Sequence, residues 1–323
     1  MPTVVRPLLI VNPRAAGRRT GSDWAQTAAA VDRVIGPFDA EFTEHRGHAE
    51  DLACAASAAG RELVVAVGGD GTLSEVVNGV LSASGAGSQL DMHPPETAVG
   101  LIAQGTGGDF RRSLAIGRTL DQCLERLASG RERRVDVGTL EYLAAPDVPR
   151  RRYFLNIVSA GMGGLVDRYV VASPPWVGGR IAYYAATLRA LATVPLARLH
   201  CRIVLDGVTS EREIDSRVIA VCNGAYFGSG MHVAPDAQVD DGRLEVVSIG
   251  TRTRFELVAK SPTVYRGAHL SIKAVQHFSC ESIELSLPAG PAAERFPLDV
   301  DGDPLGYLPL RAGVVRQALR VRA

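Results

Sequence analysis

Short apolar runs that alternate with helix-like segments are the feature that most constrains the fold of residues 1–138. Each run is continuous and does not alternate with polar residues, which is typical of a strand buried on both faces. Strands of this kind, separated by helices, indicate a parallel sheet covered on both sides. The predicted strands are Leu8–Asn12, Asp39–Thr43, the LVVAV run at 63–67 and Val99–Ala103.

The segments between these strands have helical spacing or composition. Helices are predicted at Trp24–Ile35, Ala49–Ala59, about Leu73–Ser82 and from about Gly108, with a long loop at Ser82–Glu96. Residues 1–138 are therefore predicted to form a Rossmann-like, doubly wound α/β domain. Ligands of such domains bind at the carboxyl ends of the strands.

Beyond residue 138 the pattern changes to short strands separated by turn residues. The runs RRYFLNIVSAG, RLHCRIVLDG, REIDSRVIAVCNG, GRLEVVSIG and SIELSL predict a mainly antiparallel β-rich domain, a sandwich, over residues 139–308. One apolar helix is predicted at Ile181–Thr193. The tail at about 309–323 is expected to pack back on the first domain.

The charges and cysteines limit the class of protein. Lysine plus arginine balances aspartate plus glutamate at 35 each, so no net charge attracts nucleic acid. Lys260 and Lys273 are the only lysines, so no glycine-rich loop carries the lysine of a P-loop. Scattered cysteines without a CxxC pair, no N-terminal signal and no run of ~18 apolar residues predict a soluble, cytoplasmic protein with reduced thiols.

Two glycine-rich segments follow predicted strands, GGDGT at Gly68–Thr72 and GTGGD at Gly105–Asp109. Turns of this kind expose backbone N–H groups, and a following helix N-terminus favours an anion. Two such loops on neighbouring strands suit the phosphates of one nucleotide.

Neither loop completes the GxGxxG fingerprint, because Ser74 and Phe110 stand where the third glycine should be. Redox chemistry with NAD or FAD is therefore disfavoured. The alternative is that both segments are tight turns with helix N-caps at Thr72 and Asp109.

With these motifs in order, the sequence resembles the diacylglycerol kinase catalytic-domain family, which includes bacterial lipid kinases and sphingosine kinases. GGDGTLSEVVNG resembles the family's nucleotide-binding signature, and VNPRAAG, FTEHRGHA and GTGGDFRRSL resemble other loops of the same domain. FLNIVSAGMGG, VAPDAQVDDGRLEVV and LDVDGDPL resemble elements of the second domain. The matches are collinear and cover nearly the whole chain.

The resemblance implies an ATP-binding domain, a lipid-substrate domain and a cleft between them, where a lipid hydroxyl accepts the γ-phosphoryl group. The implied nucleotide-binding residues are Asn12, Gly17, Thr43, Gly68, Gly69, Asp70, Gly71, Thr72, Glu75, Gly105 and Thr106. The implied structural metal site takes one carboxylate and two backbone carbonyls from Gln238, Asp241 and Arg243. Oxygen ligation of this kind suits Mg²⁺.

Phosphoryl transfer also needs a group that accepts the proton of the alcohol. Asp301 and Asp303 are the candidates for cation ligand and base, and Asp303 stands at the base position, where the family usually has glutamate. Asp70 is a further catalytic candidate that could orient Mg²⁺ or polarise the alcohol. Without the family, VDGD predicts a hairpin turn, since Asp-Gly is a strong hairpin signal.

The chain departs from the family at Gly108, where the family has Asn, and at Gln104, where it usually has Pro. One alternative function is an NAD kinase, which shares GGDGT but not VNPRAAG, GTGGDF and VDGD in order. The other is a nucleotide- or lipid-binding protein that has lost catalysis through the changes at Gly108 and Asp303.

The resemblance further implies a lipid substrate, a role in phospholipid biosynthesis and transient peripheral contact with a membrane surface. It leaves a homodimer open. Arg150–Arg152 is expected at an exposed hairpin tip, with contact to anionic headgroups as the alternative. His45 and His48 are expected on a solvated face, with a metal site as the alternative.

Overall fold

The computed structural model describes residues 6–84, 94–105, 108–145, 148–174, 185–187, 189–190, 193–228, 230–251, 253, 256, 260–288 and 296–322. The chain divides into two compact units. Unit 1 contains Met1–Val137, Val239–Gly242 and Val315–Ala323. Unit 2 contains Gly138–Gln238 and Arg243–Val314.

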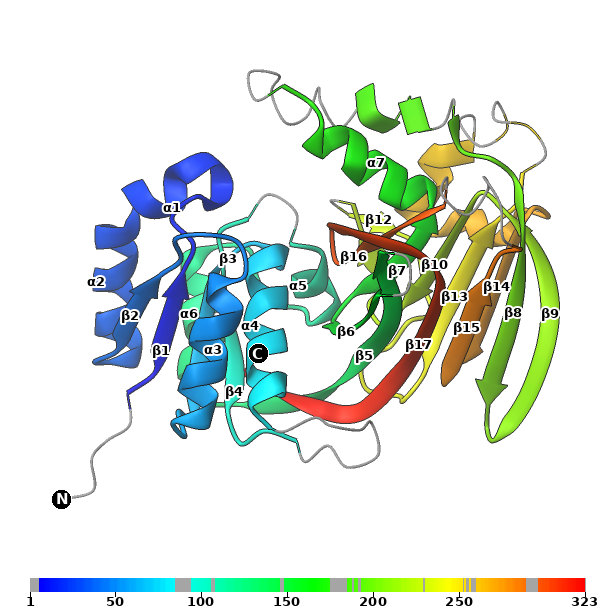
Figure 1. Ribbon diagram of the computed structural model, residues 1–323. Coiled ribbons are helices and arrows are strands. Elements are labelled where there is room, and N and C mark those ends of the chain that lie inside the picture. Colours follow the sequence, from blue (N-terminus) through cyan, green and yellow to red (C-terminus); the bar gives the residue numbers. More distant parts are fainter. Residues whose placement is uncertain are drawn as a thin grey trace. The chain divides into compact units, whose positions relative to one another are not determined.

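Unit 1 contains a parallel sheet with the strand order β4-β3-β1-β2 (Figure 1). Val321 and Arg322, at the end of the long strand β17, pair in parallel with β4. Every residue of β1 and β3 is buried, as expected for strands covered on both faces. The strands are β1 (Leu8–Val11), β2 (Asp39–Phe42), β3 (Leu63–Gly68), β4 (Ala98–Ala103) and β17 (Asp303–Arg322).

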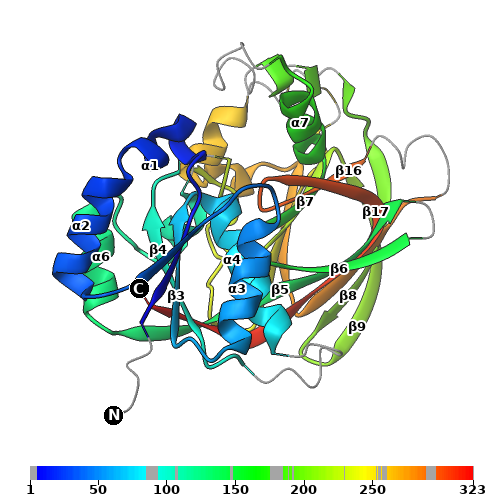
Figure 2. The same cartoon turned by 60° about the vertical axis from the view of Figure 1, so that its left-hand side comes forward.

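The helices of unit 1 lie in two pairs, α2 with α6 and α3 with α4, on opposite sides of the strands (Figure 2). This arrangement confirms the predicted doubly wound, Rossmann-like class. The helices are η1 (Ala15–Arg18), α1 (Arg19–Ser22), α2 (Trp24–Ile35), α3 (His48–Ala58), α4 (Asp70–Ala83), α5 (Asp109–Ser113) and α6 (Leu120–Ala128).

The predicted start of one helix is wrong, and so are both N-caps of the alternative interpretation as tight turns. Helix α4 begins at Asp70, before the predicted Leu73, and its N-cap is Gly69. The N-cap of α5 is Gly108, so neither Thr72 nor Asp109 caps a helix. Thr72 instead accepts a hydrogen bond from a neighbouring loop, and an aspartate in the first turn suits the positive end of α4. Of the predicted loop at 82–96, residues 82 and 83 are helical and residues 85–93 lie outside the described part.

Unit 2 is β-rich and antiparallel, which confirms the predicted sandwich class. One run of paired strands is β14-β13-β10-β7-β16, and another is β9-β8-β15-β17. The strands are β5 (Glu132–Ala145), β6 (Val148–Phe154), β7 (Ile157–Gly161), β8 (Ala197–Leu205), β9 (Val208–Ser216), β10 (Val218–Cys222), β11 (Tyr226–Phe227), β12 (Met231–His232), β13 (Leu244–Ile249), β14 (Val275–Cys280), β15 (Ser282–Ser286) and β16 (Pro297–Val300).

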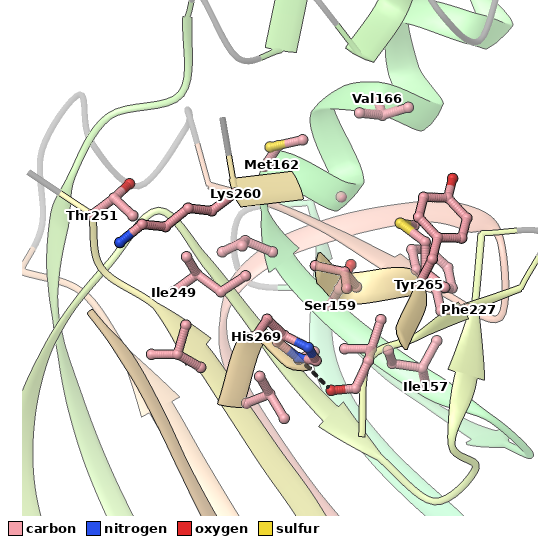
Figure 3. Close-up of a pocket in the computed structure, with 18 of the residues that line it drawn as sticks. Ile157, Ser159, Met162, Val166, Phe227, Ile249, Thr251, Lys260, Tyr265 and His269 are labelled. Carbon is pink, nitrogen blue, oxygen red and sulfur yellow. Dashed lines mark hydrogen bonds between the residues drawn. The ribbon is translucent and has the colours of Figure 1, made fainter. Parts of the chain in front are cut away.

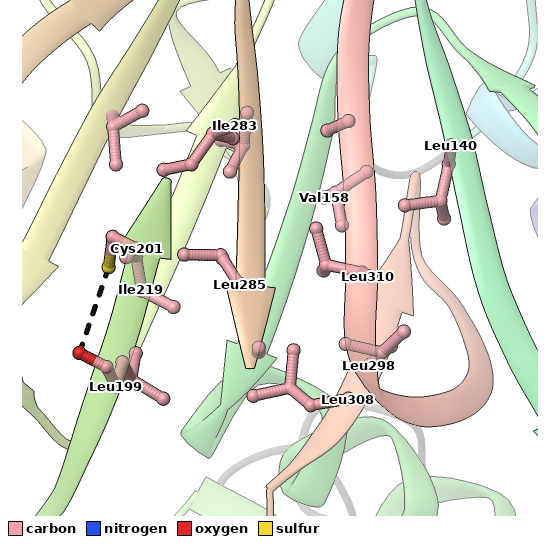
Figure 4. Close-up of a cluster of buried hydrophobic side chains, with 14 of the residues drawn as sticks. Leu140, Val158, Leu199, Cys201, Ile219, Ile283, Leu285, Leu298, Leu308 and Leu310 are labelled. Atoms are coloured by element: carbon pink, nitrogen blue, oxygen red, sulfur yellow. Dashed lines mark hydrogen bonds between the residues drawn. The ribbon is translucent and has the colours of Figure 1, made fainter. Parts of the chain in front are cut away.

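The core of unit 2 lies between these two runs of strands. Leu199 and Leu285 from one run meet Ile219 and Leu298 from the other (Figure 4). Strand β8 alternates buried and exposed residues from Ala197 to Ile203, because only one face of it meets the core. Unit 2 also contains helix α7 (Met162–Val171) and the 3₁₀ helices η2 (Ser261–Arg266) and η3 (Ala268–Ser271).

Several predictions for unit 2 need correction. RRYFLNIVSAG forms two strands, because Leu155 and Asn156 donate their amides to the Asp301 carboxylate at the break. REIDSRVIAVCNG is likewise divided between β9 and β10. Arg150–Arg152 lies within β6 and not at a hairpin tip, since the pairing of β5 with β6 continues to Ala145 and Val148.

The predicted helix at 181–193 lies largely outside the described residues, although residues 185–187, 189–190 and 193 are helical. All five cysteines are free. Among the described helices, none is both long and apolar enough to cross a membrane.

Candidate functional site

Three predicted site segments meet at one edge of the unit 1 sheet. Strands β1, β3 and β4 are parallel neighbours, so Asn12, Gly68 and Gly105 lie at or just after their carboxyl ends, at the same edge. The Asn12 amide donates to Thr72 Oγ1 at 3.1 Å, and the Gln104 N–H donates to the Gly68 carbonyl at 2.8 Å. The first loop and both glycine-rich loops are therefore connected by hydrogen bonds.

The two glycine-rich loops also touch backbone to backbone. A Cβ atom built on Gly105 would lie 2.4 Å from the Cα of Gly69, well inside van der Waals contact. Any side chain at Gly105 would push the loops apart. Thr106, predicted to bind the nucleotide, lies outside the described residues.

Asp70 joins the start of α4 to the start of α5. Its carboxylate accepts hydrogen bonds from the backbone N–H groups of Gly108 at 2.7 Å, Asp109 at 3.2 Å and Phe110 at 3.4 Å. Gly108 has φ 65° and ψ 44°, the left-handed region that Gly and Asn occupy most readily. Glycine at this position adopts the required backbone conformation as readily as asparagine would.

The remaining predicted nucleotide-binding residues surround the same edge. Glu75 accepts from the amides of Gly47 at 3.0 Å and Ala49 at 3.2 Å, where α3 begins. The backbone N–H of Thr43 donates to the Val11 carbonyl at 2.9 Å, which places Thr43 beside the end of β1. Gly17, with φ 69°, lies in the turn that follows β1, and Gly71 is exposed in the first turn of α4. An edge with a helix N-terminus and glycine-rich backbone suits an anion such as phosphate.

Asp301 lies in the tip of a hairpin in unit 2, as VDGD alone predicts. Val300 pairs with Asp303, and Asp301 and Gly302 have positive φ angles of 51° and 90°. The Asp301 carboxylate accepts three backbone N–H groups, from Leu155 at 2.8 Å and from Asn156 and Ile157 at 2.9 Å. Enclosure of the carboxylate raises the pKa of Asp301 to about 6, although the three amides act in the opposite direction.

Asp303 forms an ion pair with Arg152 of β6, with 3.0 Å between Oδ2 and Nη2. Both side chains are largely buried, at 22% and 18% exposed. Arg152 therefore orients the candidate base. The sequence interpretation placed Arg152 at an exposed hairpin tip and missed this role, because only the register of β5 with β6 brings the residue next to the hairpin.

Asn156 is a second residue that the sequence interpretation missed. Its backbone amide donates to Asp301, its side-chain amide donates to the Tyr226 carbonyl, and its own carbonyl accepts from Asn223 and Gly224 at 2.9 Å. Within the described part of the chain, its buried Oδ1 has no partner. The sequence feature that could have pointed to Asn156 is the presence of an asparagine inside the otherwise apolar run FLNIV.

A cavity of about 250 Å³ opens in unit 2 beside β7, α7, β10, β13 and the η2–η3 segment (Figure 3). Its lining is mainly aliphatic. The polar exceptions are Ser159, Thr187, Thr251, Lys260, Tyr265 and His269. Cavities with an apolar lining and few polar groups are suited to lipid chains.

The predicted metal ligands follow one another in the loop before β13. Gln238 and Asp241 are exposed, and Arg243 forms an ion pair with Asp206 at 3.1 Å. Burial, and secondarily the charges of Asp241 and Asp240, raise the pKa of Asp136, whose carboxylate accepts from Gly242 at 2.6 Å. This concentration of oxygen and negative charge fits a hard cation.

No cluster of three or more His, Cys, Asp or Glu side chains among the described residues suits a metal ion. A site at this loop would therefore depend on backbone carbonyls, as the resemblance implies. His45 and His48 stack on each other with ring centres 4.9 Å apart, and His45 is exposed.

Comparison with known proteins gives two family matches. A family model described as the diacylglycerol kinase catalytic domain matches residues 6–140, and one described as the YegS C-terminal NAD kinase beta sandwich-like domain matches residues 156–323. Relatives named diacylglycerol kinase include those of Staphylococcus carnosus, 26% identical over 98% of this chain and 88% of the relative, and Bacillus subtilis, 25% identical over 94% and 91%. A third, from Mycobacterium tuberculosis, is 28% identical over 84% of this chain and 80% of the relative.

Solved structures show the same fold. A diacylglycerol kinase from Bacillus anthracis superposes with a TM-score of 0.66 at 19% identity, covering 98% of this chain and 96% of that one. Another Bacillus anthracis structure gives a TM-score of 0.71 at 21% identity, covering 98% and 97%.

Proposed function

Since the chain belongs to the diacylglycerol kinase catalytic-domain family, we propose that it transfers the γ-phosphoryl group of ATP to the hydroxyl of a diacylglycerol-like lipid. One observation carries the proposal for the lipid. Strand β7 donates an amide to the carboxylate of the VDGD hairpin through Ile157 and also lines the apolar cavity through Ile157 and Ser159. A lipid chain held there would lie along the same strand that supports the candidate acid–base residues.

In this proposal the nucleotide phosphates bind the glycine-rich edge of unit 1. Their ligands are the backbone of Gly68–Thr72 and Gly105–Thr106, together with Asn12, Gly17, Thr43 and Glu75. The contacts of Asp70 support a positioning role, because its carboxylate holds the start of α5 through three amides.

Asp303 is the proposed base, which takes the proton of the lipid hydroxyl as its oxygen attacks the γ-phosphorus and ADP leaves. Asp301 keeps the hairpin tip and Asp303 in place, and its carboxylate is the second candidate for contact with the cation. A structural Mg²⁺ would be held by Asp241 with the carbonyls of Gln238 and Arg243. A separate cation that neutralises phosphate charge would contact the hairpin at Asp301.

A parallel assay with γ-labelled ATP and separate samples of diacylglycerol, a sphingoid base, a prenyl alcohol and NAD tests this function. We expect label in the diacylglycerol-like lipid and none in NAD. Transfer to NAD alone would replace the proposal with an NAD kinase.

A catalytically inactive binding protein is the second candidate, favoured by the short Asp303 side chain and its ion pair with Arg152. ATP binding without transfer to any lipid, unchanged in Asp303→Glu, would establish it. Since the substrate of a lipid kinase resides in a bilayer, we also propose transient contact of the protein with a membrane surface.

A further inference from the structure

His269 lies in η3 and lines the apolar cavity, with only 1% of its surface exposed (Figure 3). Its Nε2 lies 2.9 Å from the backbone carbonyl of Val233. A carbonyl oxygen can only accept, so Nε2 must carry the proton of the ring. Burial lowers the pKa of His269 despite the hydrogen bond to Val233, and His232 and His277 add to the lowering, which favours the neutral ring. The remaining nitrogen, Nδ1, is therefore an acceptor with a free lone pair.

Nδ1 is buried, and the described residues offer it no hydrogen-bond partner. The same holds for two other lining atoms, Ser159 Oγ and Thr251 Oγ1. A hydroxyl can rotate to donate or accept, whereas Nδ1 in this tautomer can only accept. Leaving a buried acceptor unpaired is unfavourable, so a ligand that brings a donor is favoured over one that does not.

Ser159 is a poorer contact for a ligand than His269. A Cβ atom built on Gly163 would lie 2.1 Å from Ser159 Oγ, so this hydroxyl already faces the backbone of α7 at close range. Lys260, the one charged amine of the lining, is engaged by Glu256 at 2.8 Å. His269 Nδ1 is thus the lining atom that can only accept a hydrogen bond and has no donor among the described residues.

We propose that the cavity binds the apolar chain of the substrate lipid and that a hydroxyl or amide N–H of that lipid donates a hydrogen bond to His269 Nδ1. The identity of the ligand as the substrate rests on the proposed kinase function. The esters of a simple diacylglycerol only accept hydrogen bonds, and in the proposed function its one hydroxyl is held at Asp303, so neither group satisfies Nδ1. The preferred substrate therefore carries a donor in addition to the hydroxyl that is phosphorylated, either as an amide linkage or as a hydroxylated chain.

Binding of three matched lipids to the full-length protein, measured without ATP, tests this selection. The probes are dioctanoylglycerol, its analogue with one ester replaced by an amide, and its analogue with a hydroxyl on one chain. We expect the wild type to bind at least one donor-bearing probe about tenfold more tightly than the diester, the size of one hydrogen bond to a buried acceptor. Preference for the amide analogue would place the donor in the linkage, and preference for the hydroxylated analogue would place it on the chain.

Three variants assign the preference to His269. His269→Phe should abolish it, because the ring then has no acceptor. His269→Gln should keep it, since the amide can donate to Val233 and still accept from the ligand. Ser159→Ala, which removes the neighbouring unpaired hydroxyl, should also keep it.

Equal binding of all three probes by the wild type, or a preference that survives in His269→Phe, overturns the proposal. If His269→Phe does not fold, loss of the preference in Ser159→Ala, or in a folded His269→Gln, overturns it. Because these measurements contain no ATP, a protein that keeps the donor preference but phosphorylates no lipid contradicts the proposed function and not this selection.

Discussion

At the residue scale, single carboxylates hold together backbone segments that are far apart in sequence. Asp70 accepts three amides at the start of α5, and Asp301 accepts three amides between β6 and β7. Both residues stand out in the sequence as acids among glycines, which predicts a site but not its partners. The partners could not be predicted, because no local pattern encodes a contact over 38 or 146 residues.

The pH dependence of stability tests the enclosure of Asp301. Its pKa of about 6 lies above the value of 3.8 for a free side chain, so the folded state takes up a proton first as the pH falls. The unfolding free energy of the wild type relative to Asp301→Asn should therefore rise between about pH 7 and about pH 4. The expected rise is about 1–3 kcal/mol, since solvent still reaches part of the residue.

Urea denaturation of both proteins at each pH measures this difference. The comparison with the variant removes the contribution of other groups, such as Glu132, whose pKa is lowered by Arg322 and Arg320 despite its burial. A relative stability that is flat or falls on acidification would show that the Asp301 carboxylate is not enclosed.

The ion pair between Arg152 and Asp303 gives a second test at this scale. Arg152→Met should reduce kcat by about tenfold or more with little change in the KM for ATP, because the base loses the partner that orients it. Arg151→Met is the matched control, since Arg151 is adjacent, pairs with Glu141 and is 68% exposed. Steady-state kinetics in which both variants behave alike would remove Arg152 from the site.

At the element scale, strand and helix positions follow from apolar patterning, but their ends do not. The run at Trp24–Ile35 predicts α2 over its whole length. In contrast, α4 begins at Asp70 and FLNIV is broken at Asn156, because tertiary hydrogen bonds to Asp70 and Asp301 compete with the local pattern. Boundaries therefore depart from the prediction at the candidate site residues themselves.

The contact between the glycine-rich loops belongs to this scale. Gly105→Ala would place a Cβ atom 2.4 Å from Gly69 Cα, so we expect a loss of about 1–3 kcal/mol of unfolding free energy and weaker ATP binding. For stability, Gly71→Ala is the control, because a Cβ atom at this helical position meets nothing within 4 Å. Equal thermal stability of the two variants would contradict the close approach of the loops.

At the scale of the whole molecule, the ordered motifs predict the family, and the family models and relatives confirm it. The two-part class, a parallel α/β sheet followed by antiparallel strands, is predictable because strand patterning changes near residue 138. The cavity and the tautomer of His269 were not predictable. They depend on which of many similar aliphatic side chains line a space, and on one carbonyl 36 residues away.

Transfer of label from γ-labelled ATP to a lipid by the wild type and by Asp303→Ala tests the central claim most directly, with ATP binding measured on both proteins. We expect the wild type to phosphorylate a diacylglycerol-like lipid, Asp303→Ala to lose at least about a hundredfold in kcat, the size of a general-base contribution, and both to bind ATP equally. Asp303→Glu should retain activity. Equal transfer by wild type and Asp303→Ala, or ATP binding with no transfer by either, would contradict the proposed lipid kinase.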